Sequence, residues 1–237
     1  MKLSITLITI CMALASSALA LAESNELVSF RFRMISWGAE PLSGIALPID
    51  GEMKSLYAPI DQRSEALHYR GGRELSFSKH PGGKDDGALV VGKLTANAEW
   101  REVLFLAQYD RKSENLNLLA LDDSKAAHPE NSIRLLNLSG RPIAGLVNGE
   151  KVVLDEVKDQ AVSLNGSQGF VPLQFVRKDS TETNWTRFLS TAIEVRQHAR
   201  ILIIFYPSLA DDLSGEREVS FKLYYDLPEE EKFTWLN

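Results

Sequence analysis

The stretch VSFRFRM, residues 28–34, alternates apolar and polar side chains without a break. Its valine, two phenylalanines and methionine would face one side, and its serine and two arginines the other. A period of two residues is typical of a β-strand that has one face in the core and the other in solvent. The run 219–225 repeats the pattern near the C-terminus. We therefore predict half-buried strands at both ends of the chain.

Between these runs lie continuous apolar stretches at 88–94, 103–107 and 201–206, rich in β-branched or aromatic residues. Such stretches predict strands in the centre of a sandwich, covered by the facing sheet. Turn dipeptides are dense, and Asn148-Gly149 is a strong signal for a two-residue hairpin. Helical periodicity is confined to 61–67, where a loop explains the sequence equally well. The predicted fold class is all-β.

An internal repeat divides the chain into two halves. Leu75 and Phe77 recur 98 residues later as Leu173 and Phe175. At the same offset residues 103–106 match 201–204, and at slightly longer offsets 30–31 match 133–134 and 115–122 match 219–226. We therefore predict two tandem antiparallel β-sandwiches of Ig-like size. The predicted bounds are a signal peptide at 1–22, sandwiches at 23–123 and 132–228, a linker at 124–131 and an acidic C-terminal tail at 229–237.

The N-terminal segment has the features of an export signal. Lys2 supplies a short basic region, and residues 3–15 are apolar or small and uncharged. Small-x-small patterns accepted by signal peptidase follow at 18–20 and 20–22. A transmembrane anchor is the alternative, but the apolar run is short for a span and no basic stop follows it. We expect cleavage, export to the periplasm or the extracellular space, and no stable membrane span afterwards.

Cys11 is the only cysteine and lies inside this leader, without the context that lipoprotein processing requires. The mature chain would therefore have no disulfide, no cysteine nucleophile and no thiolate metal site. The whole chain has a formal net charge of −6. Cleavage removes Lys2 and no acid, which makes the charge −7. A mildly acidic chain is a poor candidate for nucleic-acid binding.

One segment carries a family resemblance. The run HPENSIRLLNLSG, residues 128–140, with Asn148-Gly149 shortly after it, resembles a recurrent segment of uncharacterised exported bacterial β-sandwich proteins. The resemblance covers residues 128–149 only. It implies an envelope location and a sandwich fold. It brings no known activity and no catalytic residue.

The sequence contains no recognisable catalytic constellation. No two of the histidines His68, His80, His128 and His198 have zinc-binding spacing, and we interpret them as solvated or strand-surface residues. A Gly-x-Ser-x-Gly elbow and a phosphate-binding loop are both absent. We expect no catalytic residue and no cofactor, although a site assembled from distant loops stays possible.

Three acidic doublets in predicted loops are weak candidates for calcium ligands. Carboxylates at the end of a sandwich can supply the hard oxygen ligands that Ca²⁺ requires. The doublets lack EF-hand spacing, and aspartate is also a common turn residue. They are Asp85-Asp86, Asp122-Asp123 and Asp211-Asp212.

Trp37 and Trp185 are the candidate ligand-binding residues. Each lies among polar residues, where an exposed indole could stack on a sugar ring or anchor a protein partner. The alternative is burial at the rim of each sandwich. Trp100 begins a predicted strand and is interpreted as structural.

We therefore expect a non-catalytic exported protein that binds or scaffolds another envelope component, either a protein or a glycan. A carbohydrate-binding module using Trp37 and Trp185 is one alternative, and a hydrolase with a dispersed site is the other. An uncovered edge strand at 28–34 or 219–225 would favour a partner that adds a strand to the sheet.

Overall fold

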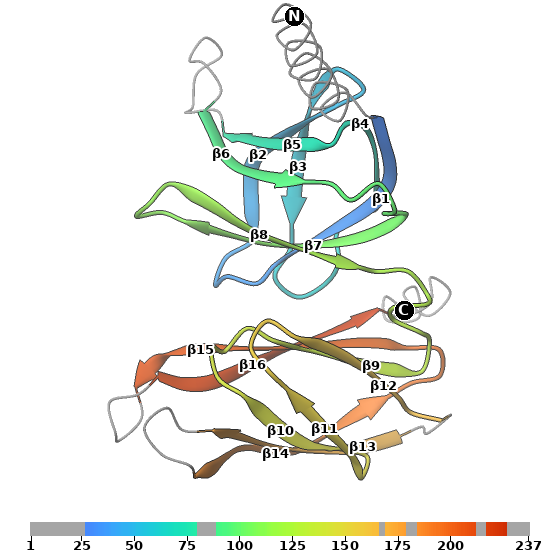
Figure 1. Cartoon of the computed structure of the whole chain (residues 1–237), viewed down its shortest axis with the longest axis vertical. Coiled ribbons are helices and arrows are strands. Elements are labelled where there is room, and N and C mark those ends of the chain that lie inside the picture. Colours follow the sequence, from blue (N-terminus) through green and yellow to red (C-terminus); the bar gives the residue numbers. More distant parts are fainter. Residues whose placement is uncertain (1–26, 80–88, 166–168, 179–183, 212–216, 227–237) are drawn as a thin grey trace, which may run out of the picture. The chain divides into compact units, whose positions relative to one another are not determined.

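The computed structural model describes residues 27–79, 89–165, 169–178, 184–211 and 217–226 (Figure 1). These residues form sixteen strands and no helix, so the all-β prediction is confirmed. No helix in this part of the chain is long and apolar enough to cross a bilayer. The predicted signal peptide and C-terminal tail lie outside the described residues.

The chain divides into two compact units. The first consists of Met1–Ile60 and Ser64–Asp122, and the second of Asp61–Arg63 and Asp123–Asn237. The main division lies between Asp122 and Asp123, at the start of the polar stretch in which the sequence predicts the domain boundary. The short segment Asp61–Arg63 forms no turn of helix and leads into a strand that starts at Leu67.

The first unit is a sandwich of two four-stranded sheets with the orders β4-β1-β7-β8 and β3-β2-β5-β6. Within it only the neighbours β1 and β7 run parallel. Its strands are β1 (Leu27–Ser36), β2 (Leu42–Ile49), β3 (Glu52–Ala58), β4 (Leu67–Gly72), β5 (Glu74–Lys79), β6 (Leu89–Thr95), β7 (Glu102–Asp110) and β8 (Asn115–Asp122).

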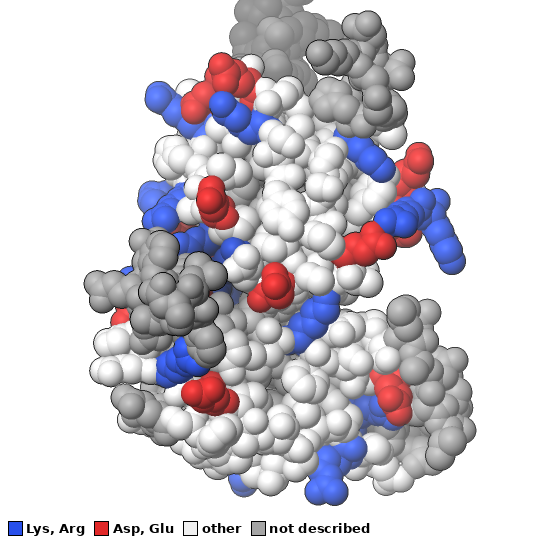
Figure 2. Space-filling view, turned by 180° about the vertical axis from the view of Figure 1, so that it is seen from behind, with Lys and Arg blue, Asp and Glu red and all other residues white. Residues whose placement is uncertain are grey.

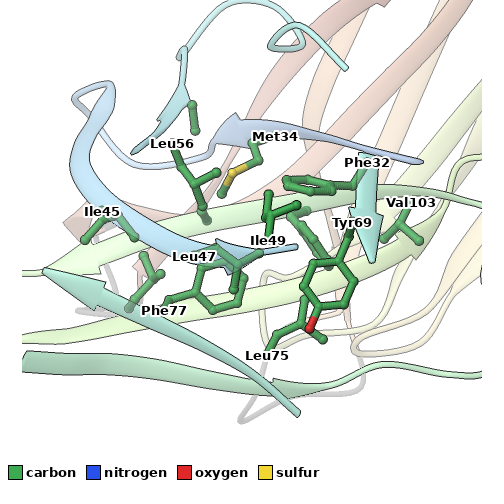
Figure 3. Packing of buried hydrophobic residues seen from close by; sticks show 14 of the residues in the cluster. Phe32, Met34, Ile45, Leu47, Ile49, Leu56, Tyr69, Leu75, Phe77 and Val103 are labelled. Atoms are coloured by element: carbon green, nitrogen blue, oxygen red, sulfur yellow. The ribbon is translucent and has the colours of Figure 1, made fainter. Parts of the chain in front are cut away.

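The core of this unit follows from the alternation along β1. Phe32 and Met34 point between the sheets, where they meet apolar residues of β2 and β5 such as Leu47 and Phe77 (Figure 3). The serine and arginines between them lie on the other face. Trp100 packs edge-on against a core phenylalanine at 5.3 Å between ring centroids, consistent with the structural role predicted for it.

The second unit repeats this topology strand for strand, with the sheet orders β12-β9-β15-β16 and β11-β10-β13-β14 (Figure 1). The parallel pair recurs as β9 and β15. Its strands are β9 (Ser132–Asn137), β10 (Ile143–Val147), β11 (Glu150–Leu154), β12 (Asp159–Ser163), β13 (Gly169–Lys178), β14 (Trp185–Val195), β15 (Arg200–Asp211) and β16 (Arg217–Asp226). All four repeat matches join strands that occupy the same place in the two units.

The registers correct two of these matches in detail. Val103 pairs with Phe32, and its repeat counterpart Ile201 pairs with Ile133, so the counterpart of Ile133 is Phe32 rather than Phe30. A two-residue slip keeps the same face of a strand, which is why the pattern could not detect it. Between β8 and β16 the registers give an offset that is one residue shorter than the predicted one.

Strand positions correct two further expectations and show which of the two candidate edge strands lies at an edge. The run 88–94, predicted to be central, forms β6 at the edge of its sheet, where Leu89 and Val90 are exposed. The run 28–34 lies inside its sheet, and only 219–225 forms an edge. Along β16 the predicted inward face is only partly correct, because Phe221 and Tyr225 remain exposed.

Two hairpins of the repeat share one turn geometry. Asn148-Gly149 joins β10 to β11 with positive φ at both residues, as the dipeptide predicts. Asp50-Gly51, 98 residues earlier, joins β2 to β3 in the same way, with φ values of 51° and 82°. The repeat offset of 98 residues therefore leads directly from the Asn148-Gly149 turn to this second one.

Val157 combines a β-branched side chain with a φ of 56°. This conformation is strained for valine, whereas asparagine tolerates it. We expect Val157→Asn to raise the free energy of unfolding by about 1 kcal/mol in equilibrium urea unfolding. Val153→Asn is the matched control, because both valines are 65% exposed and Val153 lies within the extended strand β11. Equal effects of the two substitutions would contradict the strain argument.

Candidate functional site

A cavity of about 650 Å³ opens in the first unit. Three parts of the chain line it: the loop that follows β1, the C-terminal end of β5, and the β7–β8 hairpin. The β5 end contributes Lys79, and the hairpin contributes Gln108, Tyr109 and Arg111. A hydrogen bond from Ser36 Oγ to the carbonyl oxygen of Glu40, at 2.6 Å, fixes the loop. The lining is therefore mainly polar and carries both signs of charge.

Lys79 and Tyr109 form the best-defined pair in this cavity. Both residues are half-buried. Lys79 Nζ donates a hydrogen bond to the Tyr109 hydroxyl at 3.3 Å and lies 4.3 Å from the centre of its ring. In the described part of the chain no carboxylate lies within salt-bridge distance of Lys79. The ammonium group is thus held in place by an aromatic neighbour, and no carboxylate of the described residues neutralises its charge.

The second cation of the cavity, Arg111, is in a different situation. It forms an ion pair with Glu40 between two exposed side chains at the rim. Solvent screens such a pair, and its carboxylate already occupies the guanidinium group. Lys79 is therefore the group with most capacity to attract an anion.

In the second unit, the region that corresponds to the cavity is occupied by side chains that hydrogen-bond to the backbone. Strand registers make Asn137 the counterpart of Ser36, and Arg177 the counterpart of Lys79. The Asn137 side-chain amide donates to the backbone carbonyl oxygens of Arg141 at 2.7 Å and Leu154 at 3.0 Å. Its oxygen accepts from the Ser139 backbone N–H and hydroxyl. The Asn137 side chain therefore connects the second unit's loop to β11, whereas the Ser36 hydroxyl donates to Glu40 within its own loop.

The second unit contains a buried cluster of charges instead. Arg63 donates to the Asp123 carboxylate at 3.1 Å and lies 3.4 Å from that of Asp226. Arg200 donates to the same two carboxylates at 2.8 and 3.3 Å, and to the Asp123 backbone carbonyl at 2.7 Å. The side chains are 3–12% exposed. Two guanidinium groups and two carboxylates thus form a charge-balanced, water-poor network.

His128 completes this cluster and corrects one expectation. It is fully buried, so its interpretation as a solvated or strand-surface histidine is wrong. Its Nδ1 lies 3.5 Å from Arg63 Nη2 and 3.9 Å from the Asp123 carboxylate, and its buried Nε2 has no hydrogen-bond partner. Neither His128 nor His198 bonds to a serine hydroxyl in the described chain, an arrangement that would have favoured the hydrolase alternative.

The cluster shifts the pKa values of its members. Burial alone would raise the pKa of Asp123, but His128, Arg63 and Arg200 outweigh burial and hold that pKa at about 2. Burial lowers the pKa of His128, and the two arginines lower it further against the opposing effect of Asp123. At neutral pH the cluster therefore contains ionised Asp123 and neutral His128.

The two predicted tryptophans lie in different units. Trp37 follows β1, is partly buried, and donates its backbone N–H to Ala107 at 3.1 Å. Its neighbour Gly38 lines the cavity. Trp185 is the first residue of β14 and is 45% exposed. Their predicted role in ligand binding stays a prediction.

The acidic doublets are only partly described. Asp85, Asp86 and Asp212 lie outside the described residues, as does His80, and Asp211 is described only as the last residue of β15. Asp122 is exposed at the end of β8, whereas the Asp123 carboxylate faces two guanidinium groups that would repel a divalent cation. Asp123 is therefore unsuited to bind calcium. Within the described residues no group of three histidine, cysteine or acidic side chains could hold a metal.

The remaining histidines have ordinary surface contacts. His68 Nε2 lies 3.2 Å from Ser29 Oγ on an exposed face. His198 Nδ1 lies 3.0 Å from the Glu130 carboxylate, which also accepts from Lys125.

No protein-family model matches the chain, and no curated protein matches its sequence. The assignment of a site therefore depends on the geometry of the cavity and of the charge cluster.

Proposed function

We propose that the protein is an exported, non-catalytic binding protein, and that the cavity of the first unit takes a polar molecule carrying an oxyanion. One observation carries the proposal. The Lys79 ammonium group reaches the cavity, is oriented by Tyr109, and contacts no carboxylate of the described chain. A cation in that state gains most from a ligand that brings the missing negative charge.

The size and chemistry of the cavity support a small ligand. About 650 Å³ lies within the range of pockets that hold small molecules. The Tyr109 hydroxyl and the Gln108 amide line the same space and can hydrogen-bond to the polar groups of a ligand. These groups suit an acidic sugar or another hydroxylated acid better than an apolar compound.

A binding role is favoured over the hydrolase alternative by the residue types present. The described lining residues include serine, lysine, tyrosine and glutamate, but no histidine or cysteine. A general base paired with a nucleophile is the minimum that nucleophilic hydrolysis requires. Among the described residues, the Ser36 hydroxyl donates to the backbone carbonyl of Glu40 and Lys79 donates to Tyr109, so neither contact pairs a serine with a general base.

The envelope location rests on the leader at 1–22 and on the cysteine-free mature sequence. The surface charge agrees with a partner other than nucleic acid. On the face drawn in Figure 2, basic and acidic side chains are interspersed rather than gathered into one basic patch. A protein that binds phosphate backbones needs a concentrated positive surface.

The test measures binding of glucuronate, inorganic phosphate and uncharged glucose to the full chain by isothermal titration calorimetry. A charge-assisted hydrogen bond contributes roughly 1.5–3 kcal/mol, so Lys79→Met is expected to weaken glucuronate or phosphate binding by at least about tenfold. Lys93→Met is the matched control, because Lys93 is an exposed lysine paired with Glu74 on the neighbouring strand. Equal affinity in both variants, or no binding of either anion, would overturn the proposal.

The exposed Trp185 favours carbohydrate binding as a second candidate. Stacking on an indole face needs no charge on the sugar. Glucose oligomers that bind the unsubstituted chain and lose affinity in Trp185→Ala, but not in Lys79→Met, would support this candidate.

A further inference from the structure

We propose that His128 is an acid-sensitive release for the segment Asp61–Arg63: when its imidazole is protonated, Arg63 leaves the buried charge cluster. The proposal concerns the second unit alone and does not depend on the ligand of the cavity. It rests on a fully buried imidazole that lies beside Arg63 and Asp123, which belong to a buried network of four charged side chains.

The charges around His128 come from four parts of the chain. Arg63 comes from the segment 61–63, Asp123 from the stretch before β9, Arg200 from the start of β15, and Asp226 from the end of β16. The His128 backbone N–H donates to the Ser124 carbonyl at 2.9 Å. These four charges sum to zero only while the imidazole is neutral. Protonation adds a third positive charge inside a group with almost no access to water.

The contact of His128 with Arg63 also opposes protonation. In the neutral ring Nδ1 can accept from Arg63 Nη2, whereas a protonated Nδ1 would point a donor at a donor. Nε2 would carry the proton in both forms of the ring and has no hydrogen-bond partner among the described residues, so protonation gains no bond there. Asp123 would attract the imidazolium, but its carboxylate already accepts from two guanidinium groups.

Of the two arginines in the cluster, Arg63 is the less firmly anchored. Arg200 belongs to a twelve-residue strand and donates to both the backbone and the side chain of Asp123. Arg63 belongs to a three-residue part of the second unit that contains no strand. Expulsion of Arg63 therefore relieves the excess charge at the smallest cost to the sheets.

The pH range follows from the direction of the shift. Because the pKa of His128 in the fold is below its ordinary value of 6.5, the unfolded chain binds the proton more readily than the folded one. The stabilisation is complete above pH 6.5 and is lost as the pH falls from there toward the lower folded value. Asp123 acts separately, because its own loss of charge falls between 3.8 and about 2.

The test follows hydrogen–deuterium exchange of the full chain between pH 7.5 and pH 4.5, corrected for the intrinsic rate. Peptides that cover residues 60–66 are expected to lose at least tenfold of their protection over this range, while those of β9 and β15 keep theirs. His128→Gln keeps a polar side chain without a titration, and its exchange is expected to be independent of pH. His198→Gln removes an exposed histidine that lies outside the cluster, and this variant should behave like the unsubstituted chain.

The same loss of protection in His128→Gln would overturn the proposal. Nuclear magnetic resonance titration of the imidazole in the unsubstituted chain decides the matter if that variant does not fold. A His128 pKa below 6.5, with a loss of protection at 60–66 that follows it, supports the release. A pKa at or above 6.5 contradicts it.

Discussion

Arg63→Ala is expected to lower the free energy of unfolding of the second unit by about 3–5 kcal/mol, the usual loss when one partner of a buried ion pair is removed. The substitution leaves Asp123 and Asp226 inside the fold with one guanidinium group between them. The buried Asp123 carboxylate then keeps only one of the two guanidinium groups that it contacts. Equilibrium urea unfolding at pH 7.5, followed by circular dichroism, measures the loss.

Two controls separate charge burial from the loss of a long side chain. Arg111→Ala removes an arginine whose ion pair with Glu40 is exposed, and its effect is expected to stay below about 1 kcal/mol. Arg63→Ala combined with Asp123→Ala restores charge balance, because Arg200 and Asp226 remain paired. The double variant is therefore expected to lose less stability than the two single losses added together. Additive losses would show that the cluster does not act as a unit.

The sequence predicts strands well where burial follows from local alternation. Every inward residue of the run 28–34 is buried, since a two-residue period and one covered face leave no other arrangement. The position of a strand within its sheet is different, because it depends on pairing with distant segments. The runs 88–94 and 103–107 have similar composition, yet β6 lies at an edge and β7 lies between two neighbours.

The candidate site could not be predicted from local sequence patterns, because its residues come from distant parts of the chain. Lys79 and Tyr109 are 30 residues apart, and the charge cluster joins residues 63, 123, 200 and 226. Charged residues at strand ends are ordinary in any sandwich, so none of them stands out by type or spacing. The repeat held one usable signal, because it aligns Lys79 with Arg177 and so marks a basic position at the end of the same strand in each half.

The repeat also leads to the second large effect, at a position where the two halves differ. The offset of 98 residues aligns Leu47, fully buried in β2, with Gly145 in β10. The ring of Phe175 fills the space beside Gly145, and a Cβ there would lie 2.4 Å from that ring and 2.3 Å from the Gln174 carbonyl oxygen. Neither neighbour can move away, because the Phe175 ring is packed in the core and the Gln174 carbonyl belongs to the backbone of the paired strand β13.

We therefore expect Gly145→Ala to destabilise the second unit by about 3 kcal/mol, the upper part of the range for overpacked cores. Gly72→Ala in β4 is the matched control, because a Cβ there would meet no atom within 4 Å. Gly72→Ala is expected to change the urea midpoint little, because the added methyl group would lie in open space. If both substitutions had the same small effect, Phe175 would have to be able to move, and the core of the second unit would then not be packed around the glycine. A large loss confined to Gly145→Ala would instead show that the Phe175 ring packs directly against the glycine, at the position where the first unit has the buried side chain of Leu47.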